Sequence, residues 1–169
     1  MTELSFVGYR SIVAGPEDPM RVKWNAVRDS LDAPPLPLTP ISDLNQIINR
    51  KITYTGESAG ADVWQTPMQT WTAARGDCED YAILKYALLK ATIPVRVVVG
   101  EIKSIAGNRP HAWCAAYVAN EWHALDSMFS QLIPVSEYIN WLPICAMHDD
   151  SVVRFGREFT INEILKGAA

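Results

Sequence analysis

The spacing of apolar residues predicts helices in the first half of the chain. Amphipathic or apolar helical segments are expected over residues 21–31, from residue 41, from Thr66-Pro67 and over residues 76–91. The second has Ile41, Leu44, Ile47 and Ile48 on one face, with Thr39 as the expected cap and Pro40 in the first turn. The segment over residues 76–91 is apolar on nearly every side, so we expect it to be central and buried.

The second half of the chain has a pattern typical of strands. Segments rich in β-branched and apolar residues predict strands over residues 95–103, 111–118, 122–126 and 151–155. The middle two are expected to form a hairpin around a tight turn at residues 119–121. A last helix is predicted near Thr160 and Glu163, which have capping-box spacing. Because helices precede an antiparallel sheet instead of alternating with strands, the expected fold class is α+β.

The domain organisation follows from a proline-rich segment. Residues 33–40 read Ala-Pro-Pro-Leu-Pro-Leu-Thr-Pro, which favours extended backbone. We therefore predict an N-terminal arm and strap over residues 1–40 and the main domain over residues 41–169.

Composition narrows the class of protein. The chain has 169 residues, of which 49% are hydrophobic, enough for a sizeable core. Its 15 Lys and Arg against 19 Asp and Glu give a net charge of -4, which argues against a nucleic-acid partner. No apolar run approaches the roughly 20 residues of a membrane span. The N-terminal sequence lacks the pattern of a secretory signal, so we expect a cytoplasmic protein, or a periplasmic one if a signal has been removed. The sequence does not indicate an oligomeric state.

Candidate chemistry is concentrated at the predicted start of the buried helix. Cys78 follows Gly76 and Asp77 there, where exposed amides and the helix dipole favour a thiolate and could hold an oxyanion. The carboxylates of Asp77, Glu79 and Asp80 act against the thiolate and raise its pKa unless a cation offsets them. These acids either cap the helix, the commoner outcome for such residues, or provide oxygen ligands for a hard cation such as calcium.

A thiolate nucleophile needs a base and a group that orients the base. His111 and Asp126 are expected to be diagonal or near-opposite neighbours near the open end of the predicted hairpin. His123 is the competing base, but in a regular strand it points to the other face from Asp126. His148 lies in a segment without clear pattern. We expect two of the three histidines to be structural.

The other cysteines and the tryptophans have simpler explanations. Cys114 and Cys145 lie in apolar segments and are expected to be buried as small hydrophobic residues. Several tryptophans, Trp64 and Trp113 among them, could shape a groove, although core packing is the more common role. The histidine spacing does not fit a metal hydrolase, and no second cysteine near Cys78 supports thiol redox chemistry.

Several segments together resemble a known family. They are residues 44–54 (LNQIINRKITY), 62–67 (DVWQTP) and 76–86 (GDCEDYAILKY), followed by His111-Ala112 and Leu125-Asp126. Over about half of the chain, residues 41–128, the sequence resembles the bacterial transglutaminase-like cysteine peptidases.

This resemblance implies a papain-like or transglutaminase-like fold with a Cys-His-Asp triad. Cys78 would be the nucleophile, His111 the base and acid, and Asp126 the orienting carboxylate. Some members bind a calcium ion beside the cysteine, and Asp77 and Glu79 match those ligands by position. Asp80 is a third candidate ligand.

Three functions are compatible with these residues. The leading prediction is a cysteine peptidase that hydrolyses a protein or peptide substrate through a thioester on Cys78. An enzymatic alternative is transglutaminase-type acyl transfer to an amine. The other alternative, suggested by the acids around Cys78 and by the missing signal, is a non-catalytic binding or structural module on the same fold.

Overall fold

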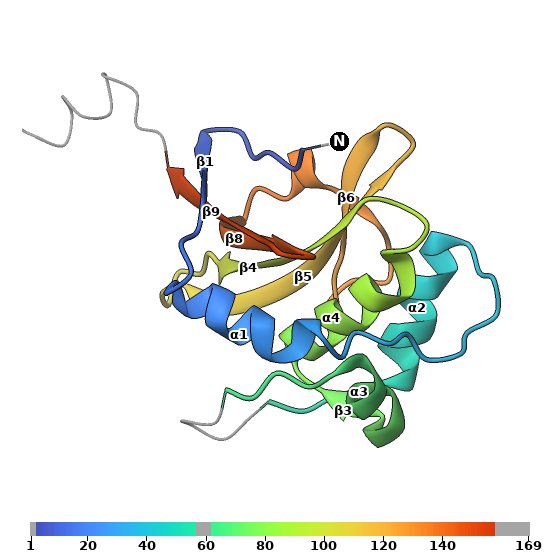
Figure 1. The fold of residues 1–169 in the computed structure, drawn as a ribbon. Helices are drawn as coiled ribbons and strands as arrows, with labels where there is room; N and C mark the ends of the chain where they lie inside the picture. Colours follow the sequence, from blue (N-terminus) through green and yellow to red (C-terminus); the bar gives the residue numbers. More distant parts are fainter. Residues whose placement is uncertain (1–2, 57–61, 158–169) are drawn as a thin grey trace, which may run out of the picture.

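The computed structural model describes residues 3–56 and 62–157, which form helices packed on a large antiparallel sheet (Figure 1). The sheet has seven strands in the order β1-β9-β8-β4-β5-β6-β7. Their bounds are β1 Tyr9–Val13, β4 Val95–Ile102, β5 Arg109–Val118, β6 Glu121–Leu125, β7 Ile133–Pro134, β8 Trp141–His148 and β9 Ser151–Arg157. All neighbours in this sheet are antiparallel. The α+β fold expected from the sequence is confirmed.

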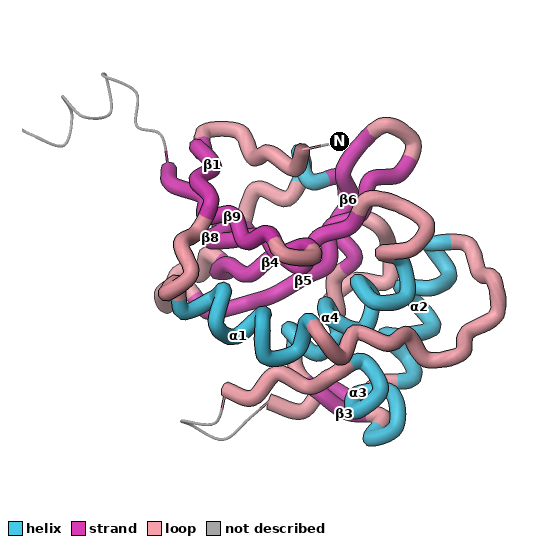
Figure 2. Tube along the Cα trace, viewed as in Figure 1, coloured by secondary structure: helices cyan, strands magenta, loops and turns pink. Residues whose placement is uncertain are grey.

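The helices gather on one face of the sheet (Figure 2). Their bounds are α1 Pro19–Arg28, α2 Ile41–Lys51, α3 Pro67–Ala73 and α4 Cys78–Leu89, with a short 3-10 turn, η1, at Val135–Glu137. A small parallel pair, β2 Thr53–Tyr54 and β3 Arg75–Gly76, joins the end of α2 to the start of α4. None of the described helices is long and apolar enough to cross a membrane.

Alternation along the central strands divides the core into two layers. Val97 and Cys114 face α4 and belong to the main core, whereas Val98 and Trp113 face the other side of the sheet. The main core is centred on α4, which is apolar around most of its circumference and contacts both β4 and β5. The predicted burial of this helix is therefore confirmed.

The N-terminal 40 residues contribute to the same sheet and core. β1 pairs with β9, and Trp24 of α1 is fully buried in the main core. The helix α1 begins at Pro19, earlier than predicted, because Asp18 caps it by accepting a hydrogen bond from the Met20 amide at 2.9 Å.

Other boundaries also differ from the expectations. The predicted Thr39 cap is wrong: the residue before α2 is Pro40, and the Thr39 hydroxyl donates to the Pro37 carbonyl at 2.7 Å. Strand β8 was not among the predicted strands; it contains Pro143, a residue that is uncommon in central strands. A register shift between Val99 and Gly100 accommodates this proline. The helix predicted near Thr160 lies outside the described residues.

Candidate active site

The backbone at the start of α4 places Cys78 as the first residue of the helix. Asp80 accepts a hydrogen bond from the Asp77 amide at 3.3 Å and two more from Gln65, from its amide at 2.8 Å and its side chain at 2.6 Å. A Cβ at Gly76 would lie 2.6 Å from a carboxylate oxygen of Asp80, so the residue at this position must be glycine. The Gly-Asp-Cys-Glu-Asp sequence thus builds a tight entry into the helix.

His111 and Asp126 form a buried pair on the neighbouring strands. The hairpin turn lies at Ala119 and Asn120, both with positive φ, and Cys114 pairs with Leu125. This register makes His111 and Asp126 diagonal neighbours, and His111 Nε2 lies 2.7 Å from Asp126 Oδ2. The exposed fractions of the two side chains are 5% and 0%.

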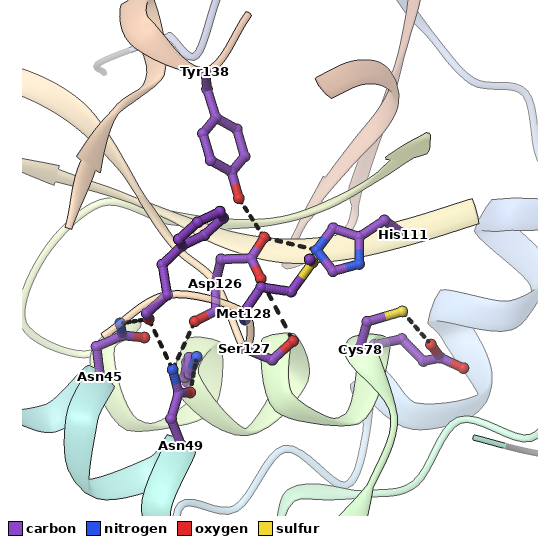
Figure 3. Close-up of polar contacts among 11 residues, drawn as sticks. Asn45, Asn49, Cys78, His111, Asp126, Ser127, Met128 and Tyr138 are labelled. Atoms are coloured by element: carbon purple, nitrogen blue, oxygen red, sulfur yellow. Dashed lines mark hydrogen bonds and ion pairs between the residues drawn. The ribbon is translucent and has the colours of Figure 1, made fainter. Parts of the chain in front are cut away.

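The tautomer of His111 follows from this contact. An ionised carboxylate only accepts hydrogen bonds, so the proton of a neutral imidazole is assigned to Nε2 and Nδ1 is the free acceptor. In Figure 3 the ring of His111 lies between Asp126 and Cys78, with its other nitrogen on the side of Cys78.

Asp126 is held as a carboxylate by its surroundings. Burial acts to raise its pKa, but hydrogen bonds from His111, the Tyr138 hydroxyl and the Met128 amide, together with the His111 charge, outweigh burial and lower it. The Met128 amide donates to Oδ1 at 2.7 Å, and Tyr138 donates to Oδ2. Asp126 is therefore equipped to orient a histidine.

The thiol of Cys78 experiences the opposite environment. Burial raises its pKa, and the charge and hydrogen bond of Glu79 raise it further, while the Ala112 amide acts to lower it. The Sγ–H donates to Glu79 Oε2 at 3.2 Å. Burial and the neighbouring acids therefore favour the neutral thiol of Cys78 over the thiolate.

Cys78 and His111 line the same cleft, whose volume is about 590 Å³. Tyr54, Trp64, Asp77 and Glu79 also line it. Burial raises the pKa of Tyr54 to about 12, and the charges of Asp77 and Glu79 raise it further. The cleft is thus rich in acidic groups around the sulfur.

The remaining candidate residues lie elsewhere. His148 Nδ1 is 3.0 Å from the Tyr86 hydroxyl, and His123 is 3.2 Å from the Glu121 carbonyl. Cys114 and Cys145 are fully buried, which confirms their expected packing role. Trp64 lines the cleft, whereas Trp113 is a core residue.

Comparison with known proteins places this arrangement in a family. The model of the transglutaminase-like superfamily matches residues 26–127, which include Cys78, His111 and Asp126. The chain belongs to the transglutaminase-like superfamily. No curated protein matches the sequence.

Solved structures show the same transglutaminase-like fold. Calcium-bound LapG from Legionella pneumophila aligns with a TM-score of 0.60 and 21% identity over 89% of this chain and 90% of LapG. EGTA-treated LapG from the same organism aligns with a TM-score of 0.58 and 23% identity over 82% of this chain and 81% of LapG. The fold is thus transglutaminase-like, as the sequence resemblance implied.

The acids around Cys78 fit a calcium ion only in part. Asp77 and Glu79 flank the thiol in the cleft and offer the carboxylate oxygens that calcium prefers. The carboxylate oxygens of Asp80 already accept hydrogen bonds from Gln65 and the Asp77 amide, so Asp80 acts as a structural group. Within residues 3–56 and 62–157, no group of three His, Cys, Asp or Glu side chains is arranged to hold a metal.

Sequence analysis missed several residues of this transglutaminase-like site. Tyr138 and Asn49 both contact Asp126, and the buried Lys85 contacts Asn49. A lysine in the middle of an otherwise apolar helix was a signal that could have been noticed. Gln65 lies in the DVWQTP segment, but nothing in the sequence indicated that it bonds to Asp80.

Proposed function

We propose that this protein is a cysteine peptidase in which Cys78, His111 and Asp126 form the catalytic triad. The observation that carries the proposal is the His111–Asp126 pair, 2.7 Å apart, in a cleft that also exposes Cys78 at the start of a helix. Nucleophile, base and orienting group are the three elements that acyl transfer through a thioester requires.

The chemistry assigns a role to each group. Cys78 Sγ attacks the carbonyl carbon of a peptide bond while His111 Nδ1 takes the thiol proton. The oxyanion that forms is stabilised by the Cys78 amide, which has no partner within the helix. His111 then gives its proton to the leaving amine, which departs and leaves a thioester. Water attacks the thioester carbonyl while His111 takes one of its protons. The C–S bond then breaks, His111 returns that proton to Cys78 Sγ, and a carboxylic acid is released.

Calcium is the second part of this proposal. The raised pKa of Cys78 means that its charged neighbours must be neutralised before a thiolate forms readily. Bound calcium, held by Asp77 and Glu79, would supply that neutralising charge. The calcium-bound form of the structurally similar LapG supports this part of the proposal.

The metal site can be tested without measuring activity. Terbium often replaces calcium, and Trp64 in the same cleft is placed to sensitise its luminescence. We expect luminescence that calcium competes away, and its loss in Asp77→Asn and in Glu79→Gln. Asp43→Asn, an acid in the first turn of α2, is the matched control and should leave luminescence unchanged. Luminescence equal in all four proteins would reject these ligands.

The triad is tested by the alkylation rate of Cys78 against pH, measured by peptide mapping with calcium and with chelator. With calcium we expect fast labelling near pH 6, below the free-thiol pKa of about 8.5. His111→Ala should lose this reactivity, and His123→Ala, on the adjacent strand, should keep it. An ordinary or buried thiol in every condition would contradict the triad.

The neutral thiol bonded to Glu79 favours one alternative, a non-catalytic module on this fold. Under that alternative Cys78 stays unreactive with calcium, and Cys78→Ser keeps partner binding. Acyl transfer to an amine is distinguished from hydrolysis by incubating the protein with a glutamine-containing peptide and a labelled amine. Only a transglutaminase would incorporate the label into the peptide. A peptidase instead releases new amino termini from a peptide library.

A further inference from the structure

A lysine is buried in the middle of α4, behind the proposed triad. The side chain of Lys85 has no exposed surface, and its Nζ donates to Asn49 Oδ1 at 2.7 Å. The ring of Tyr81 lies 5.6 Å from Nζ, and Cys114 and Asp126 are the other titratable groups that act on it. Burial lowers the pKa of Lys85 to about 7, although the charge of Asp126 opposes this shift. A buried ammonium costs stability unless it is paired, so a specific role for it is worth testing.

The partner of Lys85 reaches the orienting residue of the triad. Asn49, on α2, donates through Nδ2 to the backbone carbonyl of Asp126 at 2.8 Å and to that of Phe129 at 2.9 Å (Figure 3). Lys85, Asn49 and Asp126 therefore form a continuous chain of hydrogen bonds between α4 and the segment that follows β6.

Lys85 and the loop carbonyls together fix the orientation of the Asn49 amide. An ammonium only donates hydrogen bonds, so Asn49 must turn its oxygen towards Lys85 and its nitrogen towards the loop. The two loop carbonyls only accept hydrogen bonds, so they require the same orientation. Lys85 thus anchors the oxygen of the amide whose nitrogen holds the Asp126 backbone.

We propose that Lys85 and Asn49 are positioning residues that act through the Asp126 backbone to hold its carboxylate against His111. The proposal rests on the proposed function, since it concerns the geometry of that triad. Small displacements of catalytic groups can reduce a rate about 100-fold. The competing explanation is that this buried network only stabilises the fold.

Asn45 provides a matched control for Asn49. It lies one turn earlier on α2 and donates to the carbonyls of Phe129 at 2.9 Å and Ser130 at 3.3 Å. It therefore ties the same loop to the same helix, but the structure gives it no bond to Asp126 or Lys85. Asn49→Ala and Asn45→Ala are the same truncation at these two positions.

The experiment compares Asn49→Ala, Asn45→Ala, Lys85→Met and the double variant Lys85→Met/Asn49→Ala in the full chain. Three quantities are measured for each: the thermal unfolding midpoint, the alkylation rate of Cys78 at pH 6 with calcium, and the low-field NMR resonance of the His111 Nε2 proton. That resonance reports the bond to Asp126 and does not depend on the thiol.

We expect Asn49→Ala and Lys85→Met to lower the alkylation rate roughly 10- to 100-fold and to move or broaden the His111 resonance. Asn45→Ala should lower the unfolding midpoint but stay within about threefold of the wild-type rate. The double variant should be no slower than the slower single variant, because the two residues act in series.

Equal effects of Asn49→Ala and Asn45→Ala on both readouts, or no effect of Lys85→Met on either, would overturn the proposal. If Lys85→Met does not fold, Lys85→Gln, which keeps an N–H donor, replaces it and should retain the His111 resonance that Asn49→Ala loses. An unreactive Cys78 in the wild type rejects the proposed peptidase, whereas the His111 resonance still decides the positioning role.

Discussion

The carboxylates of Asp126, Glu79 and Asp80 are all largely withdrawn from solvent, yet the pKa of Asp126 moves in the opposite direction from the pKa values of the other two. The pKa of Asp126 is lowered, because bonds from three donors and the His111 charge outweigh burial. The pKa of Asp80 is raised to about 6, mainly by burial and also by the charge of Asp77, although Gln65 opposes this. Burial also raises the pKa of Glu79.

The difference shows what each group of residues needs for function. The Asp126 region contains its own donors, so its negative charge is stable without any added ion. The start of α4 brings several carboxylates close together. Their negative charges are therefore stable only if a proton or a cation binds beside them. This contrast is why the proposed calcium site is placed beside Cys78 and not beside His111.

The largest effect is expected from Asp126→Asn, which removes the negative charge that orients His111. An amide favours the wrong histidine tautomer and cannot stabilise the imidazolium, so the alkylation rate of Cys78 at pH 6 should fall by roughly 1,000-fold. The matched control is Asp149→Asn, because Asp149 Oδ2 lies 3.1 Å from His148 Nε2 in a second histidine–aspartate pair. A similar loss in both variants would contradict the assignment of Asp126.

The start of α4, where the acids lie, can be perturbed by a substitution that crowds its packing. Gly76→Ala would place a Cβ 2.6 Å from a carboxylate oxygen and 2.7 Å from the Cβ of Asp80. Such overpacking should lower the free energy of unfolding by about 2 kcal/mol, measured by denaturant titration. Gly15→Ala is the control, since nothing lies within 4 Å of a Cβ at Gly15. Equal stability of the two variants would show that the helix entry relaxes freely.

The pH dependence of stability sharpens the contrast between the two regions. Because the pKa of Asp80 is about 6 in the folded chain and about 3.9 in an unfolded one, the folded state binds the extra proton. Its stabilising contribution is complete below about pH 4 and is lost as the pH rises through 6, an effect of about 3 kcal/mol. Asp126 has the opposite sign: its contribution is present above about pH 4 and is lost as the pH falls through its lowered pKa.

Asp80→Asn should therefore reduce the fall in unfolding free energy between pH 4 and pH 7, measured with chelator present. Asp43→Asn, at an exposed position in α2, should leave the curve unchanged. A wild-type curve that is flat over this range would mean that Asp80 is not the group that titrates.

The site residues that lie within one helix start or one hairpin could be predicted from the sequence. Those that come together from different helices could not. The pair His111–Asp126 could be predicted because one hairpin carries both, and its turn at residues 119–120 sets the register. Cys78 could be predicted from its place at a helix start. In contrast, Asn49 reaches Asp126 from a different helix, and Lys85 reaches Asn49 from another, contacts that no periodicity encodes.

The same limit applies to the fold: local elements could be predicted from the sequence, but an accommodation between separate strands could not. The central helix and the hairpin have strong local patterns, and both were predicted close to their observed bounds. Strand β8 is central in the sheet but contains Pro143, which is tolerated because β4 shifts register opposite it. That accommodation depends on Gly100, where a Cβ would lie 2.2 Å from the Leu142 carbonyl oxygen. It becomes evident only when the two strands are seen together.

The smallest predicted effect comes from Glu79→Gln, which removes one of the negative charges beside Cys78. Glu79→Gln removes the charge that accepts the Cys78 proton, so the pKa of Cys78 should fall, although burial still raises it. With chelator present, we expect the alkylation rate at pH 7 to rise about tenfold. Glu101→Gln is the matched control, because Glu101 lines the same cleft but bonds to Asn108. An unchanged rate in Glu79→Gln would mean that burial alone keeps the thiol neutral, and a cation beside Glu79 would then do little to activate it.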